Sequence, residues 1–172
     1  EPFIGGGSVL FYLLKNYSQK INKIIINDLN TRLIETYKTI KKEPEALIYE
    51  IDKTRAEYDS ITTYREKRAY FDKKKTKFNS LEIKPENSLQ LSSLFIFLNK
   101  TGYNGMYREN NKGEFNIPCN ITIKMENQKL DLNTIKPSIY SDQNRKNFQD
   151  NILNISQLIN QKKIEIHTGT YE

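Results

Sequence analysis

Short apolar runs alternate with glycine-rich and acidic turns over the first forty residues. After the glycines at 5–7, the run Val9–Leu14 predicts a helix, and the β-branched run Ile24–Ile26 predicts a buried parallel strand. The acidic turn 27–30 follows, and from Leu33 to Ile40 apolar residues repeat with helical spacing. A turn, helix, strand, acidic turn and helix in this order form half of a doubly wound nucleotide-binding fold.

The middle of the chain has a different pattern. From about Glu45 to Phe78 it is helical and heavily charged, with nine basic and four acidic residues between Lys53 and Lys77. Such a run is typical of a solvated helix pair, and it fits a phosphate-facing surface equally well. The segment Leu89–Leu98 predicts a buried helix and leads into a polar, glycine-hinged loop. Near the end, a helix from Ile152 and a short strand at 164–166 are expected.

Composition excludes several classes of protein. The 172 residues carry 27 basic and 21 acidic side chains, a formal net charge of +6, and no stretch approaches the roughly 20 apolar residues of a membrane span. The single cysteine, Cys119, suggests a reducing compartment, so we expect a cytoplasmic protein with no membrane association. One histidine, His167, disfavours histidine-based hydrolysis, and we expect no metal site. Because the chain opens at Glu1 directly in a glycine turn, we expect it to be part of a longer protein.

The first candidate site combines the glycine turn with an acidic residue. Glycines at 5–7 let the backbone approach a ligand, and the following helix offers unpaired amides. Asp28 ends the next strand, where an acid accepts hydrogen bonds from ribose hydroxyls. The turn lacks the full dinucleotide motif and the P-loop lysine, which favours S-adenosylmethionine over NAD or ATP. A plain helix-entry turn is the alternative interpretation.

The second candidate site is the loop Asn99–Pro118, which mixes aromatic, amide and basic side chains. Arginine can contact guanine through two hydrogen bonds, amides can read adenine, and a flat aromatic side chain can stack on bases or wedge between them. By composition alone, the segment also fits an ordinary polar surface loop.

Four sequence segments follow one another along the chain and contain most residues of both candidate sites: Glu1–Val9, Asn27–Ile34, Phe97–Asn110 and Gly113–Pro118. Together they resemble the Dam-type, alpha-class family of DNA adenine methyltransferases, and the resemblance covers essentially the whole chain. It implies an α/β fold: a partial, Rossmann-like S-adenosylmethionine-dependent methyltransferase core with a mainly helical insertion. The core would comprise residues 1–44 and 150–172, and the target recognition domain residues 45–149.

The family binds S-adenosylmethionine through a Glu-Pro-Phe-x-Gly-x-Gly segment. By resemblance, Asp28 would hold the ribose, Leu29 would pack on the adenine of the cofactor, and Tyr171 would add a further contact to that adenine. The implied cofactor-binding residues are Glu1, Pro2, Phe3, Gly5, Gly6, Gly7, Asp28, Leu29 and Tyr171.

The same resemblance implies a DNA-binding set. Tyr103 would wedge into the duplex, and Arg108 would read guanine. Met106 and Pro118 would meet thymine methyl groups, with amides near the bases and backbone. The set is Lys100, Tyr103, Asn104, Met106, Arg108, Asn110, Lys112, Asn116 and Pro118.

The implied reaction is transfer of a methyl group from S-adenosylmethionine to the exocyclic amino group of a flipped adenine in duplex DNA, at a GATC-like site. The family's catalytic Asp-Pro-Pro-Tyr motif would follow Tyr171 and is not among these residues. No catalytic residue is therefore assigned, and a polypeptide limited to these residues is expected to be inactive in methyl transfer. Met106 and the Cys119-Asn120 pair depart from the family pattern and leave the target sequence open.

The expected partner is double-stranded DNA. We expect a monomer, with a cognate restriction endonuclease as a second partner if the protein belongs to a restriction–modification pair. Two alternatives stay open: a non-catalytic DNA-binding or specificity fragment that needs a partner with the catalytic half, and an RNA-directed or small-molecule methyltransferase of the same fold.

Overall fold

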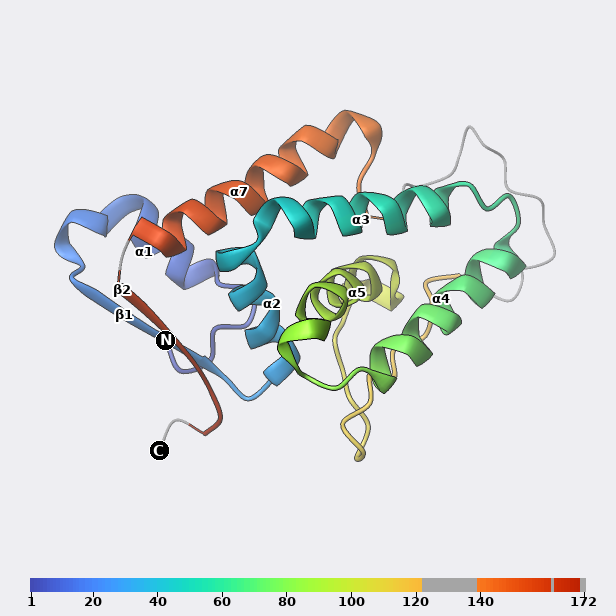
Figure 1. Ribbon diagram of the computed structural model, residues 1–172, viewed down its shortest axis with the longest axis horizontal. Helices are drawn as coiled ribbons and strands as arrows, with labels where there is room; N and C mark the ends of the chain where they lie inside the picture. The colour runs from blue at the N-terminus through green and yellow to red at the C-terminus, as the bar shows by residue number, and fades with distance from the viewer. Residues whose placement is uncertain (122–138, 162, 171–172) are drawn as a thin grey trace.

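The computed structural model describes residues 1–121, 139–161 and 163–170, and it combines helices with a small parallel sheet (Figure 1). Strands β1 (Lys23–Asp28) and β2 (Lys163–Thr168) pair in parallel along their whole length. The N-terminal segment lies along the other edge of β1, since Ile4 N donates to Asn27 O and Asn27 N donates to Glu1 O, each at 2.9 Å. β1 is therefore central, and the carboxyl ends of both strands lie at one edge.

Local sequence accounts for the starts of three main helices. The Asn30 side chain accepts from Leu33 N at 3.0 Å and caps α2, Thr63 caps α4 in the same way, and Pro44 opens α3. The helices are α1 (Ser8–Tyr17), α2 (Thr31–Lys42), α3 (Pro44–Asp59), α4 (Tyr64–Ser80), α5 (Ser88–Thr101) and α7 (Arg145–Gln161). Single 3₁₀ turns are η1 (Ser18–Lys20), η2 (Pro85–Asn87), η3 (Tyr103–Gly105) and η4 (Asp142–Asn144). None of the helices in the described part of the chain has the length and apolarity to cross a membrane.

Two hydrophobic clusters form the core. The smaller one joins the sheet to the helices beside it, and Ile26, Ile34 and Ile159 lie at its centre. The larger one fills the space between α3, α4 and α5 and includes Phe71 and Phe97. Helix α7 spans both clusters, and Ile155 packs against each of them (Figure 1). The domain boundary predicted at 149/150 falls within this helix.

The strand predicted at 24–26 forms, but its burial differs from the prediction. Ile24 and Ile26 pack in the smaller cluster, whereas Ile25 is 48% exposed. Successive side chains of a strand point to opposite faces, and the described helices cover only the face of Ile24 and Ile26. Weak alternation of apolar and polar residues from Ile121 to Met125 also predicts a short strand, and this segment falls almost entirely outside the described residues.

Candidate functional site

The glycine turn and the acidic turn meet at the carboxyl end of β1. Gly5 N donates to Asp28 Oδ2 at 3.0 Å, and Asn30 N donates to Asp28 Oδ1 at 2.9 Å. Two backbone amides thus orient the carboxylate, and each oxygen keeps a lone pair for a further donor. We call residues 1–7 and 28–30 the glycine–aspartate turn. The structure brings its two halves, which are 23 residues apart in sequence, into direct contact.

Two side chains that sequence reasoning missed hold this turn in place. Tyr37 Oη donates to Gly5 O at 2.9 Å from α2. Burial raises the pKa of Tyr37, and the nearby charges of Glu1 and Asp28 raise it further, so the hydroxyl remains a proton donor. Asn27 Nδ2 donates to Gly169 O at 2.8 Å and to Pro2 O at 3.3 Å. Helical spacing placed Tyr37 on the buried face of α2, but its hydrogen bond depends on tertiary contact.

The three glycines have different surroundings. Gly7 has φ +74°, and a Cβ there would lie 2.5 Å from Phe11 Cε2 and 2.7 Å from Tyr37 Oη. A side chain at this position would therefore be both strained and blocked. At Gly5 and Gly6 a Cβ would meet nothing within 4 Å. These two positions leave the backbone of the turn open to an approaching molecule.

Apolar surface and an unpaired acceptor lie within the same turn. Phe3 is 62% exposed and Leu29 is 63% exposed. Among the described residues, Glu1 Oε2 is buried without a hydrogen-bond partner. A cavity of about 440 Å³ borders the turn and is lined by Glu1, Pro2, Ile25, Asn27, His167, Thr168 and Thr170. Tyr171, the remaining predicted cofactor contact, lies outside the described residues.

The second candidate site is built around a hairpin. Asn116 N donates to Arg108 O at 3.0 Å, and Asn110 N donates to Glu114 O at 2.9 Å. We call residues 106–118 the polar hairpin. The Asn110 side chain accepts from Lys112 N at 2.9 Å and Glu114 N at 3.0 Å, so its Oδ1 organises the turn.

Most of the predicted DNA contacts are exposed to solvent. Tyr103 is 49% exposed, and Asn104 beside it has φ +54°, a left-handed conformation that asparagine tolerates. Asn99 Nδ2 donates to Gly105 O at 2.8 Å and holds that turn. Asn116 is half-buried, and the exposed members of the set are Lys100, Tyr103, Asn104, Met106, Arg108, Asn110, Lys112 and Pro118.

Arg108 is oriented by a neighbour across the hairpin. Its Nε donates to Asn116 Oδ1 at 3.0 Å. A guanidinium has five N–H groups, and this contact uses only the one on Nε. The two terminal nitrogens keep the geometry that bidentate contact with guanine requires.

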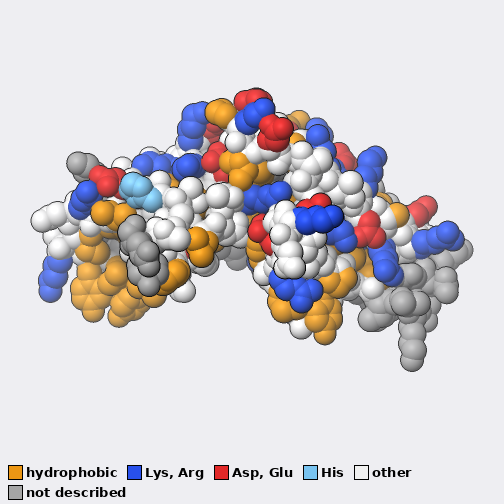
Figure 2. Space-filling model, turned by 90° about the horizontal axis from the view of Figure 1, so that it is seen from below, with side chains coloured by type: hydrophobic (Ala, Val, Ile, Leu, Met, Phe, Trp, Pro, Cys, Tyr) orange, Lys and Arg blue, Asp and Glu red, His pale blue; other side chains and the backbone are white. Residues whose placement is uncertain are grey.

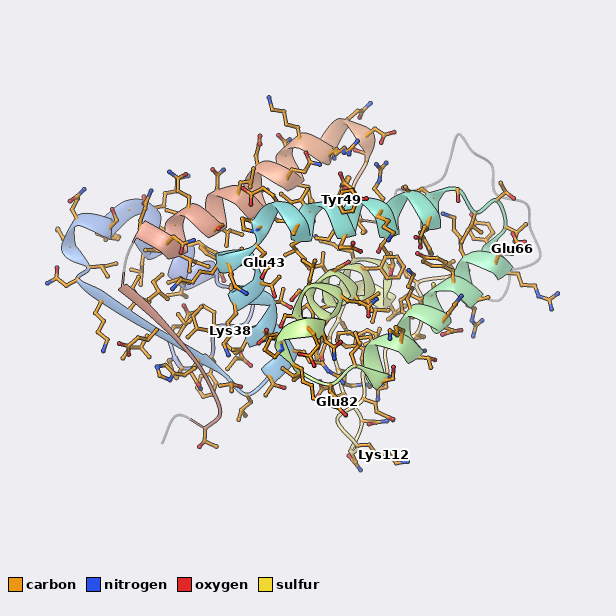
Figure 3. All side chains as sticks on the ribbon, viewed as in Figure 1. Lys38, Glu43, Tyr49, Glu66, Glu82 and Lys112 are labelled. Atoms are coloured by element: carbon orange, nitrogen blue, oxygen red, sulfur yellow. The ribbon has the colours of Figure 1, made fainter. Side chains whose placement is uncertain are left out.

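The two candidate sites face the same side of the molecule. In Figure 1, the carboxyl ends of β1 and β2 and the tip of the hairpin all point toward the lower edge. Figure 2 shows that face, with hydrophobic side chains in separate groups and basic side chains between and around them. Lys112 extends outward at the tip of the hairpin (Figure 3).

Comparison with known families gives this geometry a context. The family model described as D12 class N6 adenine-specific DNA methyltransferase matches residues 1–171. The chain belongs to this family. The resemblance that the sequence segments indicated is thereby confirmed.

Relatives of this D12-class chain carry consistent names. The type II methyltransferase M.MjaIII of Methanocaldococcus jannaschii is 38% identical over 172 residues, which are 100% of this chain and 51% of the relative. The DNA adenine methylase of Vibrio cholerae is 32% identical over 118 residues, 69% of this chain and 37% of the relative. The DNA adenine methylase of Escherichia coli strain K12 is 31% identical over 119 residues, with the same shares. The chain spans about half the length of the first of these relatives, and the matching segment covers 37% of each of the other two.

Proposed function

We propose that this chain supplies the cofactor-binding and DNA-reading parts of a site-specific DNA adenine methyltransferase. The substrate is an adenine flipped out of duplex DNA, and the methyl donor is S-adenosylmethionine. The observation that carries the proposal is the hydrogen bond from Gly5 N to Asp28 Oδ2, because it joins the two halves of the predicted cofactor site. The exposed residues of the polar hairpin support the DNA-reading part.

The glycine–aspartate turn has the groups that S-adenosylmethionine needs. Asp28 retains lone pairs for ribose hydroxyls, and the exposed side chains of Phe3 and Leu29 offer apolar surface to the adenine ring. The unpaired Glu1 Oε2 is a suitable acceptor for an ammonium group. When bound, the cofactor supplies an electrophilic methyl group on sulfonium. The residues of this chain bind and orient it.

The strand arrangement supports a Rossmann-like methyltransferase core. The N-terminal segment, β1 and β2 lie side by side in that order, with β1 in the middle. Consecutive parallel neighbours of this kind form one half of a doubly wound sheet, with the ligand at the carboxyl ends of the strands. We extend the proposal to the division into a core of residues 1–44 and 150–172 and a target recognition domain of residues 45–149.

On the DNA side, the exposed aromatic, basic and apolar residues have three kinds of proposed role: base reading and wedging, apolar contact, and phosphate contact. Arg108 reads guanine with its terminal nitrogens, and Tyr103 wedges into the duplex beside the target base. Met106 and Pro118 offer apolar contacts to thymine methyl groups. Lys100 and Lys112 pair with phosphates of the DNA backbone. These roles fit a GATC-like site.

The target adenine must rotate out of the duplex, because the amino group of a stacked base is inaccessible to the enzyme. Flipping costs a few kcal/mol, and a wedge such as Tyr103 offsets part of the lost stacking. We also propose that the protein is a monomer and that it acts in the cytoplasm. A cognate restriction endonuclease would act on the same site if the protein belongs to a type II system.

Two binding measurements on the 172-residue chain test this proposal. Calorimetric titration should detect S-adenosylmethionine binding. Fluorescence anisotropy should show tighter binding to a GATC duplex than to a scrambled duplex of equal composition. Arg108→Ala should reduce this preference by about 1–3 kcal/mol, roughly 5- to 150-fold. Absence of cofactor binding, or equal affinity of the wild-type chain for both duplexes, would contradict the proposal.

Lys112→Ala is the matched control, because it removes a cation from the same hairpin without removing a base contact. It should weaken binding to both duplexes about equally and reduce the salt slope by about one. If it lowered the preference as strongly as Arg108→Ala, the separation of base reading from phosphate contact would be wrong.

A further inference from the structure

Arg32 connects the helix that follows the glycine–aspartate turn to the polar hairpin. It lies on α2, two residues after the capping Asn30, and its side chain is only 11% exposed. Its Nη1 donates to Gly113 O at 3.3 Å and lies 3.9 Å from Glu109 Oε1. The centre of its guanidinium is 4.5 Å from the centroid of the Phe78 ring. A residue beside one candidate site thus contacts the tip and one strand of the other.

Asn79, near the end of α4, holds the opposite strand of the hairpin. Its Oδ1 accepts from Phe115 N at 2.9 Å, and its Nδ2 donates to Phe115 O at 3.1 Å. The carboxamide therefore pairs with both backbone groups of Phe115, as a neighbouring strand would. The same Oδ1 lies 3.5 Å from Arg32 Nη1, which joins the two contacts.

Aromatic packing fixes the base of this arrangement. Phe115 is buried and meets the Phe78 ring edge-on, with centroids 6.1 Å apart. Tyr107 packs on Phe115 from the other strand at 5.4 Å. The Arg32 guanidinium covers Phe78, so the cation and the aromatic rings form one layer beneath the hairpin.

We propose that Arg32 and Asn79, which we call the hairpin anchor, are positioning residues for base reading. They hold the polar hairpin at a fixed place relative to the glycine–aspartate turn, and DNA preference depends on them although neither touches DNA. The inference rests on the proposed function of the two sites. It goes further, because it assigns specificity to two residues outside the hairpin.

The chemistry of Arg32 explains why this position uses arginine. A planar guanidinium can approach Gly113 O, Asn79 Oδ1 and Glu109 Oε1 while stacking on Phe78. A lysine keeps the charge but loses the planar fork and the stacking. Arg32→Lys is therefore a conservative variant that should loosen the hairpin without removing a cation from the surface.

The first experiment measures DNA preference for the wild type, Arg32→Lys and Asn79→Ala. Affinities for a GATC duplex and a scrambled duplex are determined at several salt concentrations. Both variants should lower the preference for GATC by about three- to tenfold, with an unchanged salt slope and S-adenosylmethionine affinity within about twofold. Lys38→Met is the matched control on α2, because Lys38 Nζ pairs with Glu35 of the same helix at 3.9 Å. It should leave the preference unchanged.

Two outcomes of this experiment would overturn the inference. An unchanged preference in both variants would show that the anchor does not position the hairpin for reading. An equal loss of affinity for both duplexes in Arg32→Lys, with no change in preference, would make Arg32 a phosphate contact instead.

The second experiment needs no DNA and separates failure of the anchor from failure of the proposed function. Hydrogen exchange of the free protein should become at least about fivefold faster at Gly113, Phe115 and Asn116 in both variants, while α5 keeps its protection. Faster exchange throughout the chain would show a loss of overall stability and contradict positioning. If the hairpin amides respond as expected but the wild type shows no preference for GATC, the proposed reading of GATC is wrong and the anchoring contact is right.

Discussion

The glycine–aspartate turn and the polar hairpin each contain a glycine in the left-handed conformation, but the surroundings of the two glycines differ. Gly7 and Gly113 have nearly equal φ values, +74° and +73°. A Cβ at Gly7 would strike Phe11 and Tyr37, whereas a Cβ at Gly113 would meet nothing within 4 Å. The first turn is packed against the core, and the second projects from it and is held by side chains of α2 and α4. The glycine–aspartate turn is thus held largely by backbone packing against the core, whereas the polar hairpin depends on side chains that are distant in sequence.

This contrast predicts that a glycine-to-alanine substitution lowers the free energy of unfolding more in the first turn than in the second. The loss in the first turn is the largest effect that we expect. Gly7→Ala combines left-handed strain with a steric clash and should lower the free energy of unfolding by about 2–4 kcal/mol. Gly113→Ala adds strain alone, about 1–2 kcal/mol. Urea denaturation of the two variants measures the difference. Equal losses would show that the two turns are not packed as differently as the structure indicates.

The carboxylate of Asp28 provides the next test. Asp28→Ala removes the acceptor for Gly5 N and Asn30 N as well as the proposed ribose contact. Hydrogen bonds to a charged group contribute about 1.5–3 kcal/mol, so S-adenosylmethionine affinity should fall at least about tenfold. Calorimetry measures this loss, and affinity for a GATC duplex should stay within about twofold.

Asp150→Ala removes an exposed carboxylate from α7 and serves as the control for charge. It should bind S-adenosylmethionine as the wild type does. Should Asp28→Ala also retain wild-type affinity, Asp28 would have no place in the cofactor site.

The smallest expected effect concerns Cys119 at the base of the hairpin, where it pairs with Gly102. Burial raises the pKa of the Cys119 thiol from 9.0 to about 11. The thiolate is the reactive form, so alkylation by iodoacetamide should be slow at about pH 8 and rise about tenfold per pH unit up to about pH 10. The raised pKa also means that this group stabilises the folded state below about pH 9 and that this contribution is lost as pH rises through about 11. An alkylation rate that levels off near pH 9 would instead show that the Cys119 thiol is exposed.

Much of the fold followed from sequence because its signals are local. Helical spacing from Leu33 to Ile40 and the β-branched run at 24–26 predicted α2 and β1, and the short run at 164–166 predicted β2. The glycine turn and Asp28 were found by their spacing. Ile25 was wrongly expected to be buried, because an apolar run does not say how many faces of a sheet are covered.

The supporting contacts of the sites were beyond sequence reasoning. Arg32 and Gly113 are 81 residues apart, and Asn79 and Phe115 are 36 apart. Nothing in the spacing of a lone arginine or asparagine indicates such partners. Asn110 illustrates the opposite case: its residue type suggested a DNA contact, and the structure shows its carbonyl oxygen already used within the turn. Its role toward DNA stays a prediction.

The most direct test of the two-site account is a pair of amide chemical-shift titrations on the labelled chain. S-adenosylmethionine should shift Gly5, Gly7 and Asn30 while leaving the polar hairpin in place. A GATC duplex should shift Gly105, Arg108 and Asn116, with smaller changes in the glycine–aspartate turn. If S-adenosylmethionine left the amides of Gly5 and Asn30 unmoved, or if both ligands shifted the same residues, the account of two neighbouring sites would be contradicted.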